Sequence, residues 1–425
     1  MTDAETVTAW IADRLADPDR VVALGAGADN VDRIPGGGGP WPVWPAGNPS
    51  GAGIAMLHSE LGDRQRAHAH LATAVGAVAH ADHAGMVGGL AGIAFAARLN
   101  ARAPDDYAGA LRTLDGHLSD AVAGLAAGVA VRPVGSYATF DVISGLAGIG
   151  GYQLLSGDCG AVLTALTSLA TPTTVDGHEV PGWWVRERPG LTDSGRHALG
   201  HLNLGAAHGI AGPLALLALA WRAGVRVDGQ GEAIDTLVEA LMRRAVPAGD
   251  GYRWPAELSI DDERGGSRPT GDRKAWCYGT PGVARSIQLA ALARDRADWA
   301  ELAVASLRRV LDDPHLGHAI GDNAGLCHGW AGLLLLAVAA AADSEDSAAD
   351  GLRPAADRLT GEVLRLFDPD APFGFRHPLE DSGGYTRGPD RPGFLDGAAG
   401  IALALSAYTG GWPPRTRWPT ALLIG

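Results

Sequence analysis

Three side chains with zinc-binding chemistry lie just ahead of two glycine-started apolar segments. Cys277 stands in RKAWCYGTPG, and Cys327 and His328 stand together in GLCHGWAG. Two thiolates and one imidazole are a ligand set typical of zinc, and three protein ligands leave the fourth tetrahedral position open. Because an adjacent Cys-His pair can reach one ion only from a non-helical turn, the fold has to assemble this site. The sequence therefore predicts a catalytic zinc centre.

The ligand types also indicate what the zinc would do. Two thiolates neutralise the dication, so it is less suited to ionising water than a zinc held by three histidines. It can still deprotonate a coordinating thiol, and a thiolate carried by the substrate is the expected nucleophile. The alternative for each buried cysteine is core packing. Cys159, at the start of CGAVLTALTSL, is interpreted in that way.

A thiolate that adds to a conjugated electrophile requires a proton donor for the resulting enolate. His208, in NLGAAHGIAG, is the best candidate because imidazole titrates near neutral pH. Asp141, in TFDVISGLAG, could orient that imidazole, position substrate or cap a helix. His208 could alternatively be a satisfied buried histidine. Asp396, directly ahead of its glycine pair in FLDGAAG, is expected to be a helix N-cap.

Two further candidates flank Cys277. Arg273 precedes it by four residues and Tyr278 follows it directly. Both could stabilise an enolate oxygen by donating hydrogen bonds to it. The alternative for Arg273 is a solvated charge on a loop.

The candidate zinc ligands, the His208–Asp141 pair and Asp396 all stand just ahead of a repeated glycine pair. Gly-x-x-Gly followed by an apolar run occurs six times, and SGAGIAML is a weaker seventh copy in which Ser50 replaces the first glycine. The second glycines stand at 53, 92, 148, 212, 282, 332 and 400. The uneven spacing indicates variable loops on a constant unit. Amphipathic stretches such as GEAIDTLVEALMRRAV and DWAELAVASLRRVLDD lie between the copies.

Two kinds of helix therefore alternate, one apolar nearly all round and one half polar. Seven inner and seven outer helices predict an all-α fold, an α/α toroid, as a single domain over 1–425. Glycine allows a close approach of the backbone and φ > 0 where a helix starts. If the inner helices all begin at the same end, the residues ahead of the glycines line one cavity.

The motifs NLGAAHGIAG, WCYGTPG and CHGWAG, with the glycine repeats over about 45–410, resemble those of the lanthionine synthetase C family. The resemblance implies a seven-fold α/α barrel. It implies Cys277, Cys327 and His328 as ligands of one zinc ion, and His208 and Asp141 as the catalytic pair. It implies Arg273 and Tyr278 as further site residues.

The family's chemistry is intramolecular Michael addition of peptide cysteine thiols to dehydroalanine or dehydrobutyrine, which leaves lanthionine or methyllanthionine thioethers. The expected substrate is a dehydrated precursor peptide with a leader segment, and the expected partners are a lanthipeptide dehydratase and a transporter. Three segments outside the helical repeat, 178–201, 252–272 and 376–394, are predicted to wall a peptide groove. Trp183, Trp184 and Trp254 in them could contact peptide or pack internally. PGGGGPWPVWPAG, at 35–47, is interpreted as a linker.

Composition excludes several classes of protein. A net charge of −14 without a Lys/Arg-rich stripe argues against nucleic acid. Three cysteines fit a reducing compartment. The N-terminus lacks the basic and apolar regions of a signal peptide. The longest apolar runs, such as 331–342, fall short of the roughly 20 residues of a membrane span. We therefore expect a cytoplasmic location without membrane insertion.

Three other functions fit parts of the pattern. A protein prenyltransferase-like enzyme also alkylates a thiol on an α/α toroid, but would use a carboxylate among its zinc ligands. A non-catalytic relative could keep the zinc and bind a thiol compound such as glutathione. A glycosidase would need two opposed carboxylates, which Asp141 and Asp396 could supply, but it leaves the cysteines and His328 without a purpose.

Overall fold

The computed structural model describes residues 3–27, 30–32, 41–42, 48, 50–78, 83–188, 195–266, 269–344, 346–381, 384–387 and 389–425. Most of the expected linker at 35–47 lies outside them. The chain divides into two compact units. The first comprises Met1–Asp82, Gly88–Leu111 and Pro314–Trp418, and the second His83–Val87, Arg112–Asp313 and Pro419–Gly425. Each unit is built from buried helices with amphipathic helices packed against them.

The buried helices are those that follow the glycine pairs. Nearly all residues of these helices are inaccessible to solvent because their sequences are apolar on every side. In the first unit, α3 contacts α5 and α17, and α17 contacts α15, while in the second unit α9 contacts α7 and α12. The seven helices are α3 (Gly51–Leu61), α5 (Leu90–Asn100), α7 (Leu146–Ser156), α9 (Ala211–Arg222), α12 (Thr280–Arg294), α15 (Trp330–Ala342) and α17 (Ala398–Gly410).

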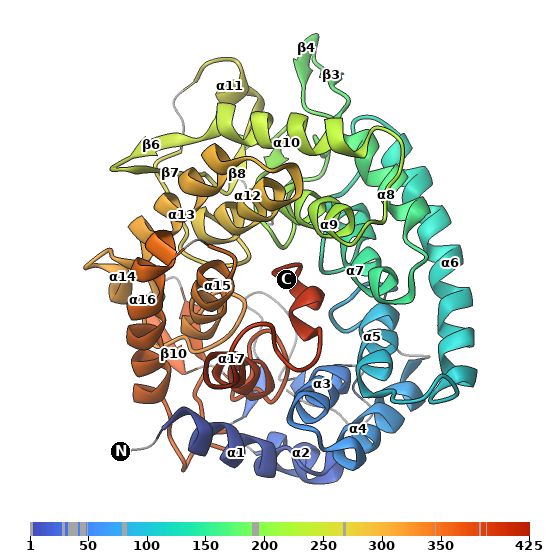
Figure 1. The fold of residues 1–425 in the computed structure, drawn as a ribbon, viewed down its shortest axis with the longest axis vertical. Helices are drawn as coiled ribbons and strands as arrows, with labels where there is room; N and C mark the ends of the chain where they lie inside the picture. Colours follow the sequence, from blue (N-terminus) through green and yellow to red (C-terminus); the bar gives the residue numbers. More distant parts are fainter. Residues whose placement is uncertain are drawn as a thin grey trace. The chain divides into compact units, whose positions relative to one another are not determined.

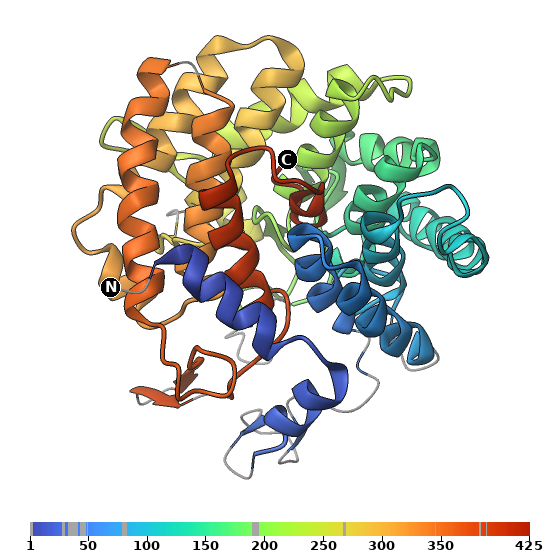
Figure 2. The same cartoon turned by 60° about the horizontal axis from the view of Figure 1, so that its bottom comes forward.

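The amphipathic helices cover the buried ones. In α13, Trp299, Ala303, Leu307 and Val310 are buried on one face, while Glu301 and Arg308 face water. The pairs α3/α4, α7/α8, α9/α10, α12/α13 and α15/α16 are neighbours in sequence and in space, and α1 packs on α17 (Figures 1 and 2). These outer helices are α1 (Ala4–Arg14), α4 (Arg64–Gly76), α6 (Ala108–Ala130), α8 (Gly160–Thr167), α10 (Gln230–Arg244), α13 (Ala297–Leu311) and α16 (Asp346–Arg365).

The second glycine that begins α7, α9, α12, α15 and α17 is required by a close backbone approach. A Cβ on Gly282 would lie 2.0 Å from the carbonyl oxygen of Trp276, and a Cβ on Gly332 would lie 2.0 Å from that of Leu326. In these five helices the preceding loop folds back across the first turn and leaves no room for a side chain. The expected positive φ occurs in the pairs only at Gly279, with φ +89°. First glycines such as Gly145 and Gly329 are extended instead.

Short strands and helices fill the connections between helix pairs. Among the described residues, the strands form five two-stranded antiparallel sheets. They are β1 (Val31–Asp32) with β2 (Trp41–Pro42), β3 (Thr173–Val175) with β4 (His178–Val180), β5 (Leu202–Asn203) with β8 (Glu257–Leu258), β6 (Val246–Ala248) with β7 (Gly251–Arg253), and β9 (Pro378–Asp381) with β10 (Gly384–Arg387). The short helices are α2 (Pro18–Gly25), α11 (Ile260–Glu263) and α14 (Leu316–Ile320), and the 3-10 turns are η2 (Tyr137–Thr139), η3 (Ser168–Ala170) and η4 (Trp418–Leu422).

The tryptophans of the expected groove segments are core residues. Trp183 is 1% exposed, and Trp184 and Trp254 are fully buried. The indole N–H of Trp184 donates to the carbonyl of Leu199, and that of Trp254 donates to the carbonyl of Leu241. Internal packing is therefore the correct interpretation of these side chains.

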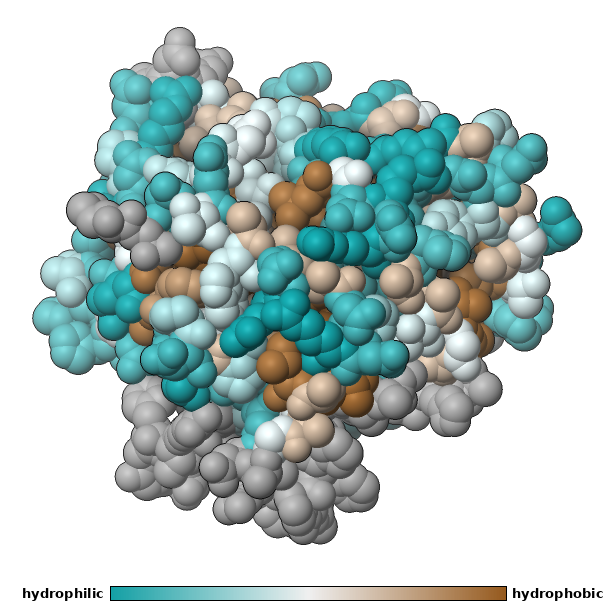
Figure 3. Space-filling model, turned by 90° about the horizontal axis from the view of Figure 1, so that it is seen from below, coloured by the Kyte–Doolittle hydropathy of each residue, from teal (hydrophilic) through white to brown (hydrophobic). Residues whose placement is uncertain are grey.

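One face of the molecule is predominantly polar. The face drawn in Figure 3 is covered mainly by hydrophilic side chains, with small hydrophobic areas between them. In the described part of the chain, no helix combines the length and the apolarity needed to cross a membrane.

Candidate metal centre and acid-base pair

The candidate residues lie on loops of one repeated design. We call the seven residues that end at the first glycine of a pair a helix-start loop; those that matter here are 139–145, 203–209, 273–279, 323–329 and 391–397. In the loop of α15, the N–H groups of Trp330, Ala331 and Gly332 donate to the carbonyls of residues 323, 324 and 325. The loop backbone thus satisfies the first N–H groups of the helix, which otherwise need side-chain caps.

Neighbouring helix-start loops are joined by backbone hydrogen bonds. In the second unit, Val142 N–H donates to the Ala207 carbonyl at 2.9 Å, and Ala207 N–H donates to the Cys277 carbonyl at 3.1 Å. In the first unit, Leu326 N–H and Cys327 N–H donate to the Leu395 carbonyl at 2.7 and 3.0 Å. The same loop position accepts in each case, two residues ahead of the first glycine. Residues at the same repeat phase are therefore brought to neighbouring positions within each unit.

His208 and Asp141 form a hydrogen-bonded pair in the second unit. Nδ1 of His208 lies 2.6 Å from Oδ2 of Asp141. The carboxylate side chain is 1% exposed and the imidazole 29% exposed. Oδ1 of Asp141 accepts from the N–H groups of Ser144 and Gly145 at 2.7 and 2.8 Å. A carboxylate oxygen accepts hydrogen bonds, so Nδ1 of His208 is the donor, and Nε2 is left to exchange a proton.

The helix-capping alternative for Asp141 is wrong. The residue that caps α7 is Gly145, which makes no side-chain cap. The carboxylate instead closes a turn of its own loop with one oxygen and holds His208 with the other.

Two tyrosine rings lie beside His208. The ring centroid of Tyr137 is 5.0 Å from that of His208, and the ring centroid of Tyr278 is 6.0 Å away. Burial raises the pKa of the Tyr278 hydroxyl, so this group keeps its proton near neutral pH and can donate. The hydroxyl also accepts from Nδ2 of Asn203 at 3.2 Å. Arg273 is exposed, and its guanidinium carbon lies 5.5 Å from the Tyr278 ring centroid, in a cation–π contact.

Sequence reasoning missed Tyr137 and Asn203. Asn203 stands six residues ahead of Gly209, as Asn323 stands ahead of Gly329. Both amide oxygens accept from the N–H two residues on, at 3.0 and 2.9 Å. The recurrence of asparagine at this repeat position could have identified Asn203 from the sequence. Tyr137 gave none, because its 3-10 turn precedes the repeated motif.

The candidate zinc ligands occupy helix-start loops of both units. Cys277 is buried in a non-helical bend of the second unit, where the indole N–H of the neighbouring Trp276 donates to the Leu422 carbonyl. Half-buried Cys327 and exposed His328 share a turn of the first unit, as their adjacency requires. In the described part of the chain, these three residues form the group of side chains that could hold a metal ion. Two sulfurs and one imidazole nitrogen suit zinc.

Cys159 is a core thiol, as predicted. It is 1% exposed and donates to the Gly150 carbonyl at 3.6 Å. Burial raises its pKa to about 12, so the thiol stays protonated near neutral pH.

Asp396 does not cap α17, which corrects that expectation. Gly397 occupies the N-cap position, and no side chain caps this helix. The N–H groups of Ala398, Ala399 and Gly400 already donate to the carbonyls of residues 391, 392 and 393. No donor at the helix start is therefore left for the Asp396 carboxylate.

Known proteins share this fold and this sequence pattern. The fold matches that of a solved structure described as nisin cyclase, with a TM-score of 0.68, 21% sequence identity, and coverage of 88% of this chain and 90% of that one. The fold is therefore an α/α toroid, as predicted. Residues 50–423 match the family described as lanthionine synthetase C-like protein, and the chain belongs to this family.

The match to a curated relative by sequence covers a smaller part of the chain. The nisin biosynthesis protein NisC of Lactococcus lactis subsp. lactis is 26% identical over 203 residues, which is 46% of this chain and 47% of that protein. This match thus spans about half the length of the relative.

Proposed function

We propose that this protein is a zinc-dependent lanthipeptide cyclase. In this proposal it forms (methyl)lanthionine rings by intramolecular addition of peptide cysteine thiols to dehydroalanine or dehydrobutyrine. The observation that supports it most is the His208–Asp141 pair, which one backbone hydrogen bond links to the Cys277 loop, in a chain of the lanthionine synthetase C-like family. The loop of His208, the proposed proton donor, is thereby joined to the loop of Cys277, a proposed zinc ligand for thiol activation.

Cys277, Cys327 and His328 would hold the zinc ion. When bound, zinc supplies a site that lowers the pKa of a peptide thiol and retains the thiolate. The set of two sulfurs and one nitrogen fits this role, since it leaves one coordination position for substrate.

The remaining site residues transfer the proton and stabilise the negative charge that develops on the enolate oxygen. Sulfur attacks the β-carbon of the dehydro residue, and the electrons of the double bond move to the α-carbon and its carbonyl as an enolate. Nε2 of a protonated His208 gives its proton to the α-carbon, and Asp141 holds the ring through Nδ1. The Tyr278 hydroxyl, kept protonated by burial, and the Arg273 guanidinium stabilise the enolate oxygen. The thiol loses one proton and the α-carbon gains one, so the reaction balances.

The rest of the proposal concerns the setting of the reaction. The substrate is a dehydrated precursor peptide with a leader segment, and a dehydratase and a transporter are the functional partners. We further propose that the segments 178–201, 252–272 and 376–394 wall a peptide groove, although residues 189–194, 267–268, 382–383 and 388 of them lie outside the described part of the chain. The proposal also includes a single catalytic domain in the cytoplasm. The prenyltransferase-like alternative loses its basis, because the chain belongs to the lanthionine synthetase C-like family.

The decisive experiment measures free thiols in a dehydrated peptide incubated with zinc-loaded protein. Thiols are alkylated and counted by mass spectrometry. We expect them to disappear with wild-type protein and to persist with a zinc-loaded His208→Asn variant. Wild-type protein that leaves the thiols at the level of buffer alone would contradict the enzyme and favour a non-catalytic relative that binds a thiol compound such as glutathione.

A further inference from the structure

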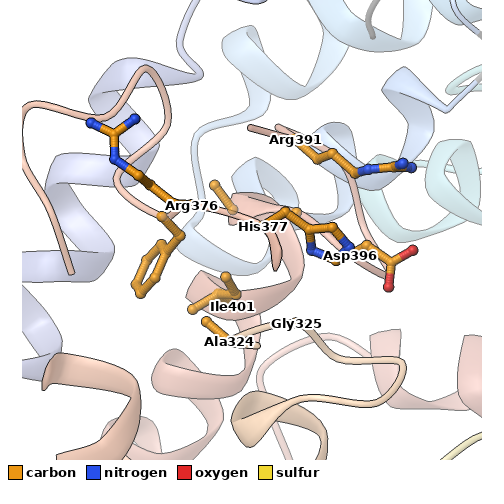
Figure 4. Close-up of a pocket in the computed structure, with 10 residues that line it drawn as sticks. Ala324, Gly325, Arg376, His377, Arg391, Asp396 and Ile401 are labelled. Atoms are coloured by element: carbon orange, nitrogen blue, oxygen red, sulfur yellow. The ribbon is translucent and has the colours of Figure 1, made fainter. Parts of the chain in front are cut away.

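A small cavity lies beside the loop that holds Cys327 and His328. It is about 10 Å³ in volume and is lined by residues of the first unit, among them Gly325, His377, Arg391 and Asp396 (Figure 4). A space of this size admits one water-sized polar group. The cavity therefore fits the tip of a ligand and excludes a bulky side chain.

The Asp396 carboxylate has an unused acceptor in this cavity. Its Oδ1 atom is buried and has no hydrogen-bond partner among the described residues. The helix behind it needs no cap, because loop carbonyls take up its first N–H groups. A buried acceptor without a donor costs free energy, so a fold that keeps one satisfies it with water or a ligand or gives it a functional role. Within the described part of the chain, Oδ1 of Asp396 is therefore an acceptor that a bound group could use.

The charges around Asp396 indicate which group would satisfy it. In Figure 4, Arg391, His377 and Asp396 lie on one side of the cavity, while the guanidinium of Arg376 points away. Arg376 is ion-paired with Asp368 at 3.0 Å. A cationic ligand would meet Arg391, and an anionic one would meet Asp396. A neutral group that both donates and accepts hydrogen bonds suits both, and the peptide amide is such a group.

The cavity adjoins the loop of Cys327 and His328, which belongs to the same unit. A Cβ placed on Gly325 would lie 3.2 Å from the Cα of Asp396, so the loops 323–329 and 391–397 are in close contact. The Leu395 carbonyl accepts from the Cys327 N–H. Asp396 also stands directly ahead of its first glycine, as His328 and His208 do. A group held by Asp396 therefore sits next to the loop of Cys327 and His328.

We propose that Asp396 is a substrate-positioning residue whose Oδ1 accepts a backbone N–H of the peptide substrate, with Arg391 facing the carbonyl of that amide. This proposal rests on the proposed cyclase function, because it names a contact of the same substrate. It concerns binding of the peptide, and proton transfer remains with His208.

Binding is measured with zinc-loaded protein and a dehydrated peptide in which every cysteine is replaced by alanine, so that no ring can form. We expect Asp396→Ala to weaken the Kd about tenfold, as loss of a hydrogen bond to a charged group implies. Asp396→Asn retains an acceptor and should weaken it less. Asp13→Ala removes an exposed carboxylate of α1, 67% exposed, and is the matched control. With the reactive peptide, KM should rise by the same factor while kcat stays within twofold.

Peptides that carry one backbone N-methyl group at successive positions identify the donor. One of them should bind wild-type protein about tenfold more weakly and show no loss with Asp396→Ala. The melting temperature and zinc content of both Asp396 variants should equal those of wild type, because Oδ1 has no hydrogen-bond partner in the part of the chain that the structure describes.

Two results would overturn the proposal. One is a Kd within twofold of wild type for Asp396→Ala, with equal N-methyl effects in both proteins. The other is loss of zinc or of thermal stability in both variants, which would make Asp396 structural. If wild-type protein binds the peptide through Asp396 but forms no ring, the cyclase function fails and the binding subsite stands.

Discussion

Nδ1 of His208 lies 2.6 Å from Oδ2 of Asp141, although the two residues are separated by 67 positions in the chain. The other carboxylate oxygen is held by two backbone N–H groups of its own loop. The imidazole is therefore fixed in position and tautomer by a group that is itself fixed. Such preorganisation is what proton transfer to a substrate carbon requires.

The Asp141→Asn variant tests whether Asp141 orients the His208 imidazole, independently of any effect on folding. The asparagine oxygen can still accept from Ser144 and Gly145, so we expect the melting temperature to change little. Its amide group would face Nδ1 of His208 with a donor and favour the wrong tautomer. We expect the rate of cyclisation to fall about 100- to 10,000-fold at full zinc occupancy. Single-turnover kinetics with a dehydrated peptide measure this, and a rate within threefold of wild type would refute the orienting role.

Metal content tests the ligand assignment without reference to activity. We expect about one zinc per chain in the wild-type protein, and near-complete loss in Cys277→Ala and Cys327→Ala. His328→Ala should weaken zinc binding because it leaves two ligands. Cys159→Ala is the matched control, since this thiol is buried and protonated. Elemental analysis after dialysis against a mild chelator gives the readout. Full zinc retention in either of the two cysteine variants would exclude that residue as a ligand.

A methyl group on Gly332 should disturb the Cys327 turn. The added Cβ would lie 2.0 Å from the Leu326 carbonyl oxygen, so the loop has to move. We expect Gly332→Ala to lower the free energy of unfolding by about 2 kcal/mol or more and to weaken zinc binding. Gly361 lies on α16, where an added Cβ would meet no atom within 4 Å, so Gly361→Ala should instead stabilise by about 0.5–1 kcal/mol. Urea unfolding of both variants checks the contrast, and equal effects would count against the steric argument.

Stability of the first unit should fall between pH 7 and pH 4. His58 and His70 both donate from Nε2 to the Leu15 carbonyl, at 2.9 and 2.7 Å. Burial lowers the pKa of His58, and it lowers the pKa of His70 from 6.5 to about 4 against the opposing effect of that hydrogen bond. Above pH 6.5 both states are neutral at His70 and its contribution is constant. Between 6.5 and 4 only the unfolded chain binds the proton, so stability declines as the pH falls.

The expected loss from His70 alone is about 3 kcal/mol across that window. Urea unfolding at pH 7.0 and pH 4.5, followed by a probe in the first unit, measures it. A His70→Gln variant should show a shallower dependence on pH. Parallel curves for variant and wild type would show that His70 is not the group responsible.

Tyr278→Phe tests the proposed enolate contact. The variant removes a hydroxyl whose pKa is raised by burial and keeps the ring that Arg273 contacts. We expect kcat to fall about tenfold or more while KM and zinc content stay unchanged. Tyr137→Phe is a useful comparison, because that ring also lies beside His208. An unchanged kcat for Tyr278→Phe would leave Arg273 as the remaining candidate for this contact.

The amino-acid sequence by itself determined the α/α toroid, the alternation of buried and amphipathic helices, and the phase at which the chemistry-bearing residues stand. These features are local, because helical periodicity and a glycine pair can be recognised within a short segment of sequence. Cys159 as a core thiol and the turn at Cys327–His328 followed from the same local logic.

Only the tertiary structure decided what each polar side chain does at that phase. Asp141 and Asp396 both precede a glycine pair, yet one is bound to His208 and the other faces a cavity with an unused oxygen. The sequence predicted a helix cap for Asp396, and for Asp141 a partner of His208 with a helix cap as the alternative. Backbone carbonyls that return from the loop satisfy the helix starts instead, and this frees the carboxylates for other contacts. Hydrogen bonds between loops far apart in sequence fix the direction of each side chain, and no local pattern encodes them.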